Sequence, residues 1–523
     1  MDTEHTVILS LLDQGMPRHY TRFCLAFRLG ETPASEPISR LEAFFRRTFQ
    51  AKPWLAGYAC PAQGGSVPMG RLEIRFSQRD IENFQVKVQE LTEDKLSLTY
   101  DELCELGMPP SKIPRDLVSS CPDRRPDTEP APILDVTVNI IRGGLLVALF
   151  LHHGVTDGAS MGTIISGQLY RETSNIPLLT PTDLAAKAHA EAETRLPLSS
   201  IPPDQPIGTH LEYKRALRAL GQTPISSLPA PAPSEVTSHI FVFSDHTLAN
   251  LKFSLNTLVQ SSPNSEIPWI TTHDALQSLL WQHLTNARLP SLTSTAATTP
   301  LPTTSTLLIP VNIRKRINPP LPPTYLGGAV ALAPATLPLT SLLPPTTTHK
   351  LHPEAVAKVV DRAYLLSTAI AIHTAIARVN DTYVREVLAL TSTQDSVKNM
   401  VDLNVDTARG LDLCITSWAV LPIFDDQGAE AEGGVEGAGG VRVGVGQKGG
   451  IKSDLGMGLG LADFVRKPWS TDAGGCIILP RDRRRARDGG KGGLEVLVQL
   501  KTGDMERLMR DAEFMECVER VID

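Results

Sequence analysis

Residues 144–158 read GLLVALFLHHGVTDG, an apolar run that ends in two histidines. The run from Leu145 to Leu151 predicts a buried strand, and it passes directly into His152 and His153. Glycines follow one and five residues after His153. Because glycine lets the backbone approach a ligand closely, a histidine at the end of this strand is well placed to meet a substrate.

The histidine pair and Asp157 allow three interpretations. Imidazole titrates near neutral pH, which makes His153 a natural general base for the proton of a hydroxyl or an amine. Asp157 can brace the turn, either by accepting hydrogen bonds from the backbone or by pairing with an arginine. His153 and Asp157 could instead bind a metal ion, but no further cluster of metal-ligating residues lies nearby, so we expect no metal. The third interpretation is that two adjacent histidines in a loop are ordinary.

Two other motifs imitate unrelated enzyme classes. Gly158 to Gly162 fits G-x-S-x-G, the nucleophile elbow of serine hydrolases, around Ser160. That elbow must follow a strand at once, whereas Ser160 falls several residues later, in a helix that we expect to begin near Asp157. Residues 444–449 spell G-x-G-x-x-G, but a segment so rich in glycine produces it by chance. We therefore expect neither a serine hydrolase nor a dinucleotide site.

Strand patterns occur in both halves of the chain. Ile133–Ile141 is strand-like, and the Arg-Gly-Gly at 142–144 predicts a hairpin with the run that follows. Residues 494–500 alternate as a strand, and a helix is expected from about Asp504 to Val521. The fold class is therefore α/β or α+β.

Two further helices are predicted from apolar residues at helical spacing. The first begins with Thr272 as its N-cap, and the second lies within Pro353 to Asn380. Their apolar faces comprise Ala275, Leu276, Leu279, Leu280 and Leu284 in the first helix, and Val356, Val359, Val360, Ala363 and Leu366 in the second.

Tracts rich in proline, glycine, serine or threonine interrupt these patterns and predict loops or linkers, because such composition cannot bury a core. We place the domain boundary in the first tract, which gives an N-terminal domain at 1–205, a Pro-rich crossover linker at 206–236 and a C-terminal domain at 237–523. The remaining tracts are 291–306, 334–348, 428–450 and 488–493.

Composition excludes several functional classes. A chain of 523 residues with 50 Lys and Arg, 57 Asp and Glu and 41% hydrophobic residues is typical of a multidomain globular protein. Its net charge of −7 argues against nucleic acid as a main partner. Seven scattered cysteines with no CxxC pair indicate reduced thiols and a cytoplasmic location. No signal peptide and no membrane-spanning run is found, so no membrane partner is expected.

Taken together, the motifs resemble the BAHD-type acyltransferases, which carry HxxxD early and DFGWG late, and in particular their fungal branch, which includes the trichothecene 3-O-acetyltransferases. Here the two motifs are residues 153–157 and the DLGMG at 454–458. Other matching segments, in order along nearly the whole chain, are 11–14, 54–57, 272–276, 311–316, 319–322 with Tyr325, Ser417-Trp418, 465–469 and 505–514.

The resemblance implies two chloramphenicol-acetyltransferase-like domains, each a mixed sheet with helices, around a central channel. It implies transfer of an acyl group from a coenzyme A thioester, with acetyl-coenzyme A the first choice, to a hydroxyl of a small secondary metabolite. His153 would be the general base for direct attack, without a covalent intermediate or a permanently bound cofactor. Asp157 would pair with Arg314, or alternatively with Arg316, and hold the histidine loop in shape.

The resemblance assigns supporting roles as well. Asp454 is grouped with His153 and Asp157 as the third signature residue, and it would shape a loop remote from the chemistry, near the coenzyme channel. The indole N–H of Trp418 is a candidate donor to the oxyanion. His152 and Gly158 would support the histidine loop. The remaining expected residues, near the coenzyme, are Gly456, Gly458 and Ser417.

The sequence departs from the family pattern at two of these places, because DFGWG has become DLGMG and the usual Tyr-x-Gly-Asn reads Tyr-Leu-Gly-Gly at 325–328. Both departures bear on how tightly coenzyme is held. The full HHxxxDG also occurs in peptide-synthetase condensation domains, so a carrier-protein-dependent, amide-forming enzyme is the alternative. A catalytically inactive binding module is a further alternative.

The sequence leaves the acceptor, the acyl length and the choice between O- and N-acylation open. It also leaves open the role of the five arginines within 481–487, as a solvated loop, a nuclear signal or a site for coenzyme phosphates. We expect a monomer, because no segment is typical of a coiled coil.

Overall fold

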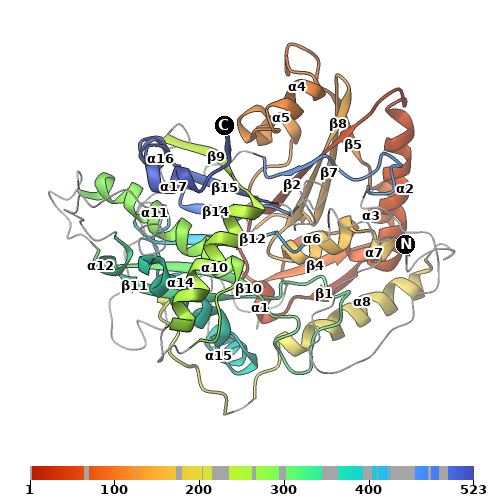
Figure 1. Cartoon of the computed structure of the whole chain (residues 1–523). Coiled ribbons are helices and arrows are strands. Elements are labelled where there is room, and N and C mark those ends of the chain that lie inside the picture. The colour runs from red at the N-terminus through yellow and green to blue at the C-terminus, as the bar shows by residue number, and fades with distance from the viewer. Residues whose placement is uncertain are drawn as a thin grey trace.

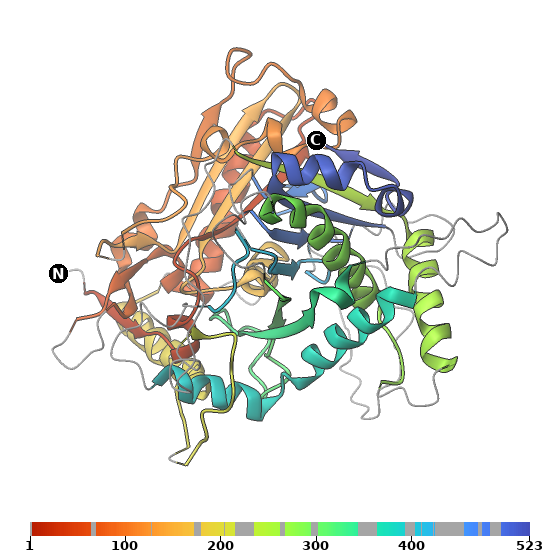
Figure 2. The same ribbon diagram turned by 90° about the vertical axis from the view of Figure 1, so that its left-hand side faces the viewer.

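The computed structural model of the chain has a mixed α/β fold, in agreement with the predicted class, and the strands among its described residues form three sheets (Figures 1 and 2). The residues that the structure describes are 3–63, 70–126, 128–171, 179–202, 204–214, 235–261, 267–293, 302–343, 363–392, 403–408, 410–421, 423, 454–468, 473–481 and 493–523.

A five-stranded sheet contains the predicted hairpin, which is confirmed. Strands β7 and β8 pair antiparallel from Leu134–Leu151 to Ile141–Gly144, and β8 is buried along its whole length. β2 pairs antiparallel with the other edge of β8, and β5 lies parallel to β7. In spatial order the strands are β13 (Phe464–Arg466), β2 (Tyr20–Arg28), β8 (Gly144–His152), β7 (Leu134–Ile141) and β5 (Lys87–Glu90).

A seven-stranded mixed sheet is built from the C-terminal half, meaning the residues after the predicted linker. The predicted strand near 494–500 is confirmed, and its neighbour β9 pairs with it along eight residues. In spatial order the strands are β11 (Val330–Pro338), β10 (Thr304–Asn312), β12 (Leu413–Ser417), β14 (Gly475–Ile478), β15 (Leu494–Lys501), β9 (Val236–Phe243) and β16 (Arg520–Ile522).

A small antiparallel sheet completes the N-terminal half. Its strands, in spatial order, are β1 (His5–Ile8), β4 (Leu72–Phe76), β3 (Tyr58–Pro61) and β6 (Ala131–Pro132). The helices of this half are α1 (Leu11–Gln14), α2 (Ser35–Ala51), η1 (Pro53–Ala56), α3 (Gln78–Asn83), α4 (Tyr100–Glu105), η2 (Pro110–Lys112), α5 (Arg115–Val118), α6 (Gly158–Ile165), α7 (Gln168–Arg171), α8 (Pro181–Arg195) and η3 (Leu196–Leu198).

The helices of the C-terminal half lie beside the seven-stranded sheet, in green, cyan and blue in Figure 1. They are α10 (Asp245–Ser261), α11 (Thr272–Thr293), α12 (Leu339–Leu342), α14 (Ala363–Arg378), α15 (Asp381–Ser392), α16 (Thr502–Met509) and α17 (Ala512–Glu516).

Two predicted helices differ in detail from the structure. The predicted apolar face of α11 is buried in the core, but the cap is Thr271 rather than Thr272, because the Thr271 hydroxyl accepts the Asp274 N–H at 3.0 Å. The single helix predicted from Asp504 to Val521 is wrong. Asp511 ends the first helix and caps a second by accepting the Phe514 N–H, and Arg520–Ile522 pairs with β9 as a strand.

The sheets do not simply follow chain order. Strand β13 comes from the C-terminal half but forms the edge of the five-stranded sheet, where it pairs with β2. Trp418, Leu455 and Met457 likewise pack in the hydrophobic core of the N-terminal half. The division into 1–205, 206–236 and 237–523 stays a prediction, since 215–234 lie outside the described residues.

Other predicted features also fall outside the described residues: the glycine-rich tract at 428–450 with its G-x-G-x-x-G, residues 482–487 of the arginine cluster, Trp469, and the 353–362 part of the second predicted helix. All seven cysteines are described and none forms a disulfide. Within the described chain, no helix combines the length and the apolar character that crossing a bilayer requires.

Candidate active site

The histidine loop, residues 152–158, connects the end of β8 to the start of α6. Asp157 is the N-cap of α6, and its carboxylate accepts the N–H of Ser160 at 2.9 Å. The carbonyl of His152 accepts the N–H groups of Val155 and Thr156. The loop is therefore a tight turn, and the predicted helix start near Asp157 is confirmed.

His153 is half-buried and held by two backbone groups. Its N–H donates to the carbonyl of His19 at 2.8 Å, and its ring Nδ1 lies 2.9 Å from the carbonyl oxygen of Thr156. A carbonyl can only accept, so Nδ1 carries a proton, and in the neutral ring Nε2 is the nitrogen with the lone pair. The ring of His19 stands edge-on to that of His153, with centroids 5.4 Å apart. The loop thus fixes the tautomer that a general base needs.

His152 is a different kind of histidine, although it is the next residue. Its side chain is buried against the edge of Tyr20, and Nδ1 has no hydrogen-bond partner among the described residues. Burial, followed by repulsion from Arg18 and His153, lowers the pKa of His152 to about 3. So low a pKa makes His152 a weak proton acceptor at physiological pH, which disfavours it as the general base.

Asp157 is fully buried and pairs with Arg314 in a bidentate geometry, at 2.8 and 3.0 Å. The N–H of Ala329 also donates to its carboxylate, at 2.9 Å. Burial alone would raise the pKa of Asp157, but the charge and hydrogen bonds of Arg314, with those from Ala329 and Ser160, hold it below its usual value. Asp157 is ionised and joins the histidine loop to the C-terminal half.

The partner of Asp157 is Arg314 and not the alternative, Arg316. Arg316 donates to the carbonyls of Ile376 and Val379, at the C-terminal end of α14, so the expectation that Arg316 could pair with Asp157 is wrong.

Ser160, the serine of the G-x-S-x-G motif, is buried inside α6 and bonded to the Leu326 carbonyl. This position is not a nucleophile elbow.

Trp418 follows directly after strand β12 and reaches the N-terminus of α6. Its ring stacks on Phe23, with centroids 4.1 Å apart, and a Cβ built on Gly158 would lie 3.4 Å from the indole Nε1. The indole therefore lies directly beside Gly158 at the start of α6. Ser417, expected near the coenzyme, ends β12 and accepts the N–H of Ala419 at 3.3 Å.

Asp454 shapes its own loop, as the sequence suggested. Its two carboxylate oxygens accept the N–H groups of Gly456 and Gly458, at 2.9 and 2.8 Å. Gly458 has φ of +79° and lies so close to Arg40 of α2 that a side chain would overlap the guanidinium. These contacts tie the loop to α2, and none of them joins Asp454 to the histidine loop.

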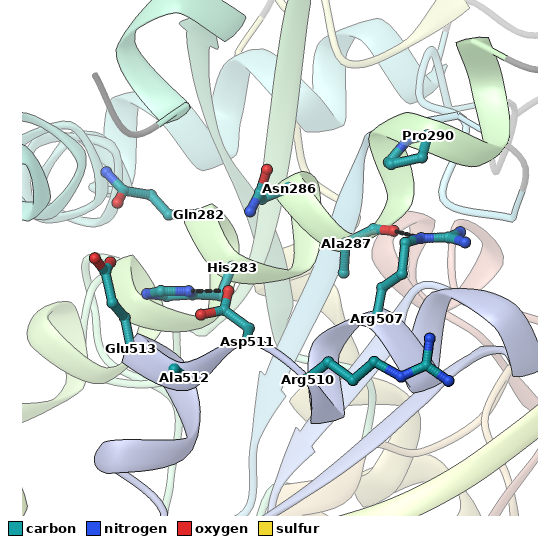
Figure 3. Close-up of a pocket in the computed structure, with 10 residues that line it drawn as sticks. All are labelled: Gln282, His283, Asn286, Ala287, Pro290, Arg507, Arg510, Asp511, Ala512 and Glu513. Carbon is teal, nitrogen blue, oxygen red and sulfur yellow. Dashed lines mark hydrogen bonds and ion pairs between the residues drawn. The ribbon is translucent and has the colours of Figure 1, made fainter. Parts of the chain in front are cut away.

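Two cavities lie on the outer side of the seven-stranded sheet. The larger, of about 470 Å³, is lined by α11, α16 and α17 and includes the His283–Asp511 ion pair at 2.7 Å (Figure 3). The smaller, of about 250 Å³, lies beside it and shares Arg510. Neither contains a residue of the histidine loop. Among the described residues, no group of three or more His, Cys, Asp or Glu could hold a metal ion.

Several contacts of the site escaped the sequence analysis. The Thr156 carbonyl orients His153, the Ala329 N–H binds Asp157, and the His19 ring faces the base. A second buried aspartate, Asp13, accepts the N–H of Gly328 at 2.6 Å, next to the amide that Asp157 binds. The sequence analysis included Asp13 only within the segment 11–14 that matches the family, and it did not indicate Gly328 as its partner.

The chain is similar to known proteins along nearly its whole length. A model described as the Transferase family matches residues 108–426, which is more than half of the chain. A second, described as the trichothecene 3-O-acetyltransferase-like N-terminal domain, matches residues 19–168. The chain is 24% identical to O-acetyltransferase ptmV of Penicillium ochrochloron, over 96% of this chain and 94% of that protein. It is 25% identical to eremophilane O-acetyltransferase ORF8 of Penicillium roqueforti, over 97% and 96%.

Solved structures match over the full length. The crystal structure of TRI101 from F. sporotrichioides with coenzyme A and T-2 aligns with a TM-score of 0.69 at 19% identity, covering 99% of this chain and 100% of that one. That of TRI101 from F. graminearum with coenzyme A and deoxynivalenol gives 0.70 at 16% identity, covering 99% and 100%. At these identities the likeness shows a shared fold.

Proposed function

The chain belongs to the Transferase family, and from this membership we propose that it is an acyltransferase that moves an acyl group from a coenzyme A thioester to a hydroxyl of a small secondary metabolite. Acetyl is the proposed acyl group, because the relatives include named O-acetyltransferases. The matching TRI101 structures contain coenzyme A, which favours coenzyme A over the carrier-protein-dependent alternative.

The observation that carries the proposal is the geometry of His153. Its Nδ1–H is fixed on the Thr156 carbonyl, so the lone pair of Nε2 is the free proton acceptor of a half-buried ring. A base of this kind must lie within hydrogen-bond reach of the acceptor hydroxyl and have the correct tautomer. The backbone of the histidine loop supplies the tautomer before substrate binds.

The proposed reaction is direct transfer. Nε2 of His153 takes the hydroxyl proton while the acceptor oxygen attacks the thioester carbonyl and forms a tetrahedral intermediate. The intermediate collapses with cleavage of the carbon–sulfur bond, and the thiolate leaving group takes the proton back from the imidazolium. Asp157 is bonded to Arg314, Ala329 and Ser160, so its role here is to hold the loop rather than to transfer protons.

The intermediate's oxyanion needs a hydrogen-bond donor, and we assign this role to the indole N–H of Trp418. This N–H lies beside Gly158 at the N-terminus of α6, and it donates to no acceptor among the described residues. A donor aimed at the developing charge contributes about 3 kcal/mol to the transition state where one has been removed elsewhere.

Further parts of the proposal concern partners and place. A coenzyme A thioester is the co-substrate, with Ser417, Gly456 and Gly458 near it, and no cofactor stays bound. The enzyme is proposed to act as a cytoplasmic monomer. A hydroxylated terpenoid is the proposed acceptor class, because relatives are named for eremophilane and trichothecene substrates.

The test begins with binding, which needs no acceptor. Acetyl-coenzyme A and free coenzyme A should both raise the melting temperature of the full chain, and acetyl-pantetheine should do so less, because a ligand of the native state stabilises it by mass action. Acetyl transfer to a panel of hydroxylated terpenoids is then followed by mass spectrometry.

The decisive variant is His153→Ala, for which we expect loss of product formation with an unchanged circular dichroism spectrum and unchanged coenzyme A binding. Ser160→Ala is the matched control, because it tests the serine-hydrolase interpretation of the G-x-S-x-G motif. It removes the hydroxyl that bonds Leu326, Asp157 and Arg314, so it should lower stability and reduce turnover in part, whereas a nucleophile's loss would abolish turnover. Appreciable turnover by His153→Ala would exclude the general-base role.

A further inference from the structure

A second buried ion pair lies beside the histidine loop, between Asp13 of α1 and Arg195 at the end of α8. Their side chains are 0% and 1% exposed, and Arg195 Nη1 lies 2.6 Å from the Asp13 carboxylate. Glu191, one turn earlier on α8, lies 3.1 Å from the other guanidinium nitrogen, and Lys52 lies 2.7 Å from Glu191. The pair is thus part of a buried charge network in the N-terminal half.

This network reaches the base through one backbone group. Arg195 Nη1 donates to the carbonyl of Val155 at 3.4 Å. The next carbonyl along the chain, that of Thr156, is the one that holds Nδ1 of His153. Arg195 therefore contacts the loop directly upstream of the group that sets the tautomer of His153.

The same network reaches the C-terminal half through residues 325–329. The N–H of Gly328 donates to Asp13, and the N–H of the following residue, Ala329, donates to Asp157. Two carboxylates from the N-terminal half, far apart in sequence, thus hold consecutive amides of one segment. The ring of Tyr325 lies near both partner arginines, with its centroid 5.9 Å from Arg195 Cζ and 5.6 Å from Arg314 Cζ.

The segment leaves no room for another arrangement. A Cβ on Gly327 would overlap the Tyr325 hydroxyl and lie 2.9 Å from Arg195 Nη1, and one on Gly328 would lie 3.2 Å from Asp13 Oδ1. Glycines at these two positions let the backbone contact the charged groups directly. The Tyr-Leu-Gly-Gly that departs from the family pattern therefore suits this contact.

Stability alone does not account for such a network. Removing two charges from water costs free energy that their mutual attraction often fails to recover, and apolar residues of similar size can be more stabilising. A planar guanidinium whose Nη1 bonds the Asp13 carboxylate and the Val155 carbonyl, while Nη2 faces Glu191, does fix geometry closely. The contact at Val155 and the contact at Gly328 are the two places where geometry is fixed.

We propose that Asp13 and Arg195 are positioning residues for acyl transfer: they hold the Val155–Thr156 backbone against residues 325–329, so that His153 keeps the Nδ1–H tautomer and the orientation of a base. The proposal deepens the proposed function and rests on His153 acting as that base. Neither residue touches substrate; both act through the backbone of the histidine loop.

The test is Asp13→Asn in the full chain, assayed with acetyl-coenzyme A and the best acceptor of the terpenoid panel. The variant keeps the shape and removes the charge that orients Arg195. We expect kcat to fall by about 10- to 100-fold, because small misplacements of a catalytic group have effects of this size, while KM for acetyl-coenzyme A stays unchanged. Asp511→Asn is the matched control, since it removes the carboxylate bonded to the buried His283, outside the histidine loop (Figure 3). It should lower the melting temperature without lowering kcat.

A structural role alone would leave the tautomer of His153 unchanged, so the second readout is ¹⁵N NMR of histidine-labelled protein, with the His153 signal assigned from His153→Ala. Wild type should show the Nδ1–H form, and Asp13→Asn should gain the Nε2–H form. If Asp13→Asn does not fold, Arg195→Lys serves instead, because it keeps a positive charge beside Asp13 but its shorter side chain, with a single nitrogen, cannot face Asp13, Val155 and Glu191 together.

The proposal is overturned if kcat falls no further than in Asp511→Asn, or if the His153 tautomer is the same as in wild type. That failure is distinct from failure of the proposed function, which would appear as retained turnover in His153→Ala. An inactive His153→Ala together with a fully active Asp13→Asn would refute the positioning role alone.

Discussion

The two aspartates of the family signature, Asp157 and Asp454, look alike in sequence, because each lies in a short loop with a glycine one or two residues later. Their surroundings differ. Asp157 is 1% exposed and accepts hydrogen bonds from Arg314 and Ala329 of the other half as well as from its own helix. Asp454 is 7% exposed and accepts hydrogen bonds from two amides of its own loop.

The difference shows that Asp157 couples its loop to the other half of the chain, whereas Asp454 shapes only its own loop. The loop of Asp157 contains the proposed base, and its geometry depends on contacts from both halves of the chain. The loop of Asp454 satisfies its carboxylate locally and is fastened by core packing of Leu455 and Met457. The same residue type in the same kind of motif therefore has a long-range role in one case and a local role in the other.

The largest expected effect tests the coupling directly. Asp157→Asn leaves Arg314, whose side chain is only 11% exposed, opposite a neutral amide, and breaking a buried ion pair costs about 3–5 kcal/mol in the free energy of unfolding. We expect kcat to fall by about 100-fold as well, because the histidine loop loses its anchor in the C-terminal half. Chemical denaturation and steady-state kinetics on the same preparation measure both quantities. Equal kcat losses in Asp157→Asn and Asp454→Asn would contradict the distinction between the two loops.

The histidine loop should also show its burial in the pH dependence of stability. The pKa of His152 falls from 6.5 to about 3 on folding, so between these values the unfolded chain binds a proton that the folded chain does not. The contribution of His152 to the free energy of unfolding is therefore fully present above pH 6.5. It declines by about 1.4 kcal/mol per pH unit as the pH falls from 6.5 toward 3.

His152→Phe removes this titration and keeps an aromatic ring against Tyr20. Its free energy of unfolding, measured in urea at pH 7, 6, 5 and 4, should fall less steeply than that of wild type. Parallel curves for the two proteins would show that His152 titrates normally in the folded state.

Sequence patterns predicted the local parts of this molecule well. The hairpin of β7 and β8, the apolar face of α11 and the helix start at Asp157 follow from residue order and turn chemistry, and all are found. The Asp157–Arg314 pairing was also anticipated, through the resemblance, and the ion pair is present. The catalytic roles of the site residues remain predictions.

The parts that sequence did not predict depend on contacts between distant segments. Asp13 and Gly328 are 315 residues apart, and neither residue type indicates the other. Strand β13 is three residues long, too short for a periodic pattern, and its place beside β2 is a tertiary outcome. The helix predicted up to Val521 failed because Asp511 caps a new helix and β9 pairs with the last residues, which outweighs helix propensity.

The smallest expected effect completes the comparison of the two loops. Asp454→Asn keeps one oxygen that can accept a backbone N–H. Its NH2 group replaces the other oxygen, so either the Gly456 N–H or the Gly458 N–H loses its acceptor. We expect a loss of about 1–3 kcal/mol in the free energy of unfolding, since one buried N–H loses its acceptor, with kcat unchanged within error. Leu455, at φ of +55°, depends on this turn to stay in a backbone conformation that is unfavourable for leucine. A loss of coenzyme A affinity in this variant without loss of kcat would place the loop beside the coenzyme, as the family resemblance implies. A fall in kcat as large as that of Asp157→Asn would instead mean that the loop reaches the base through contacts other than those of its carboxylate.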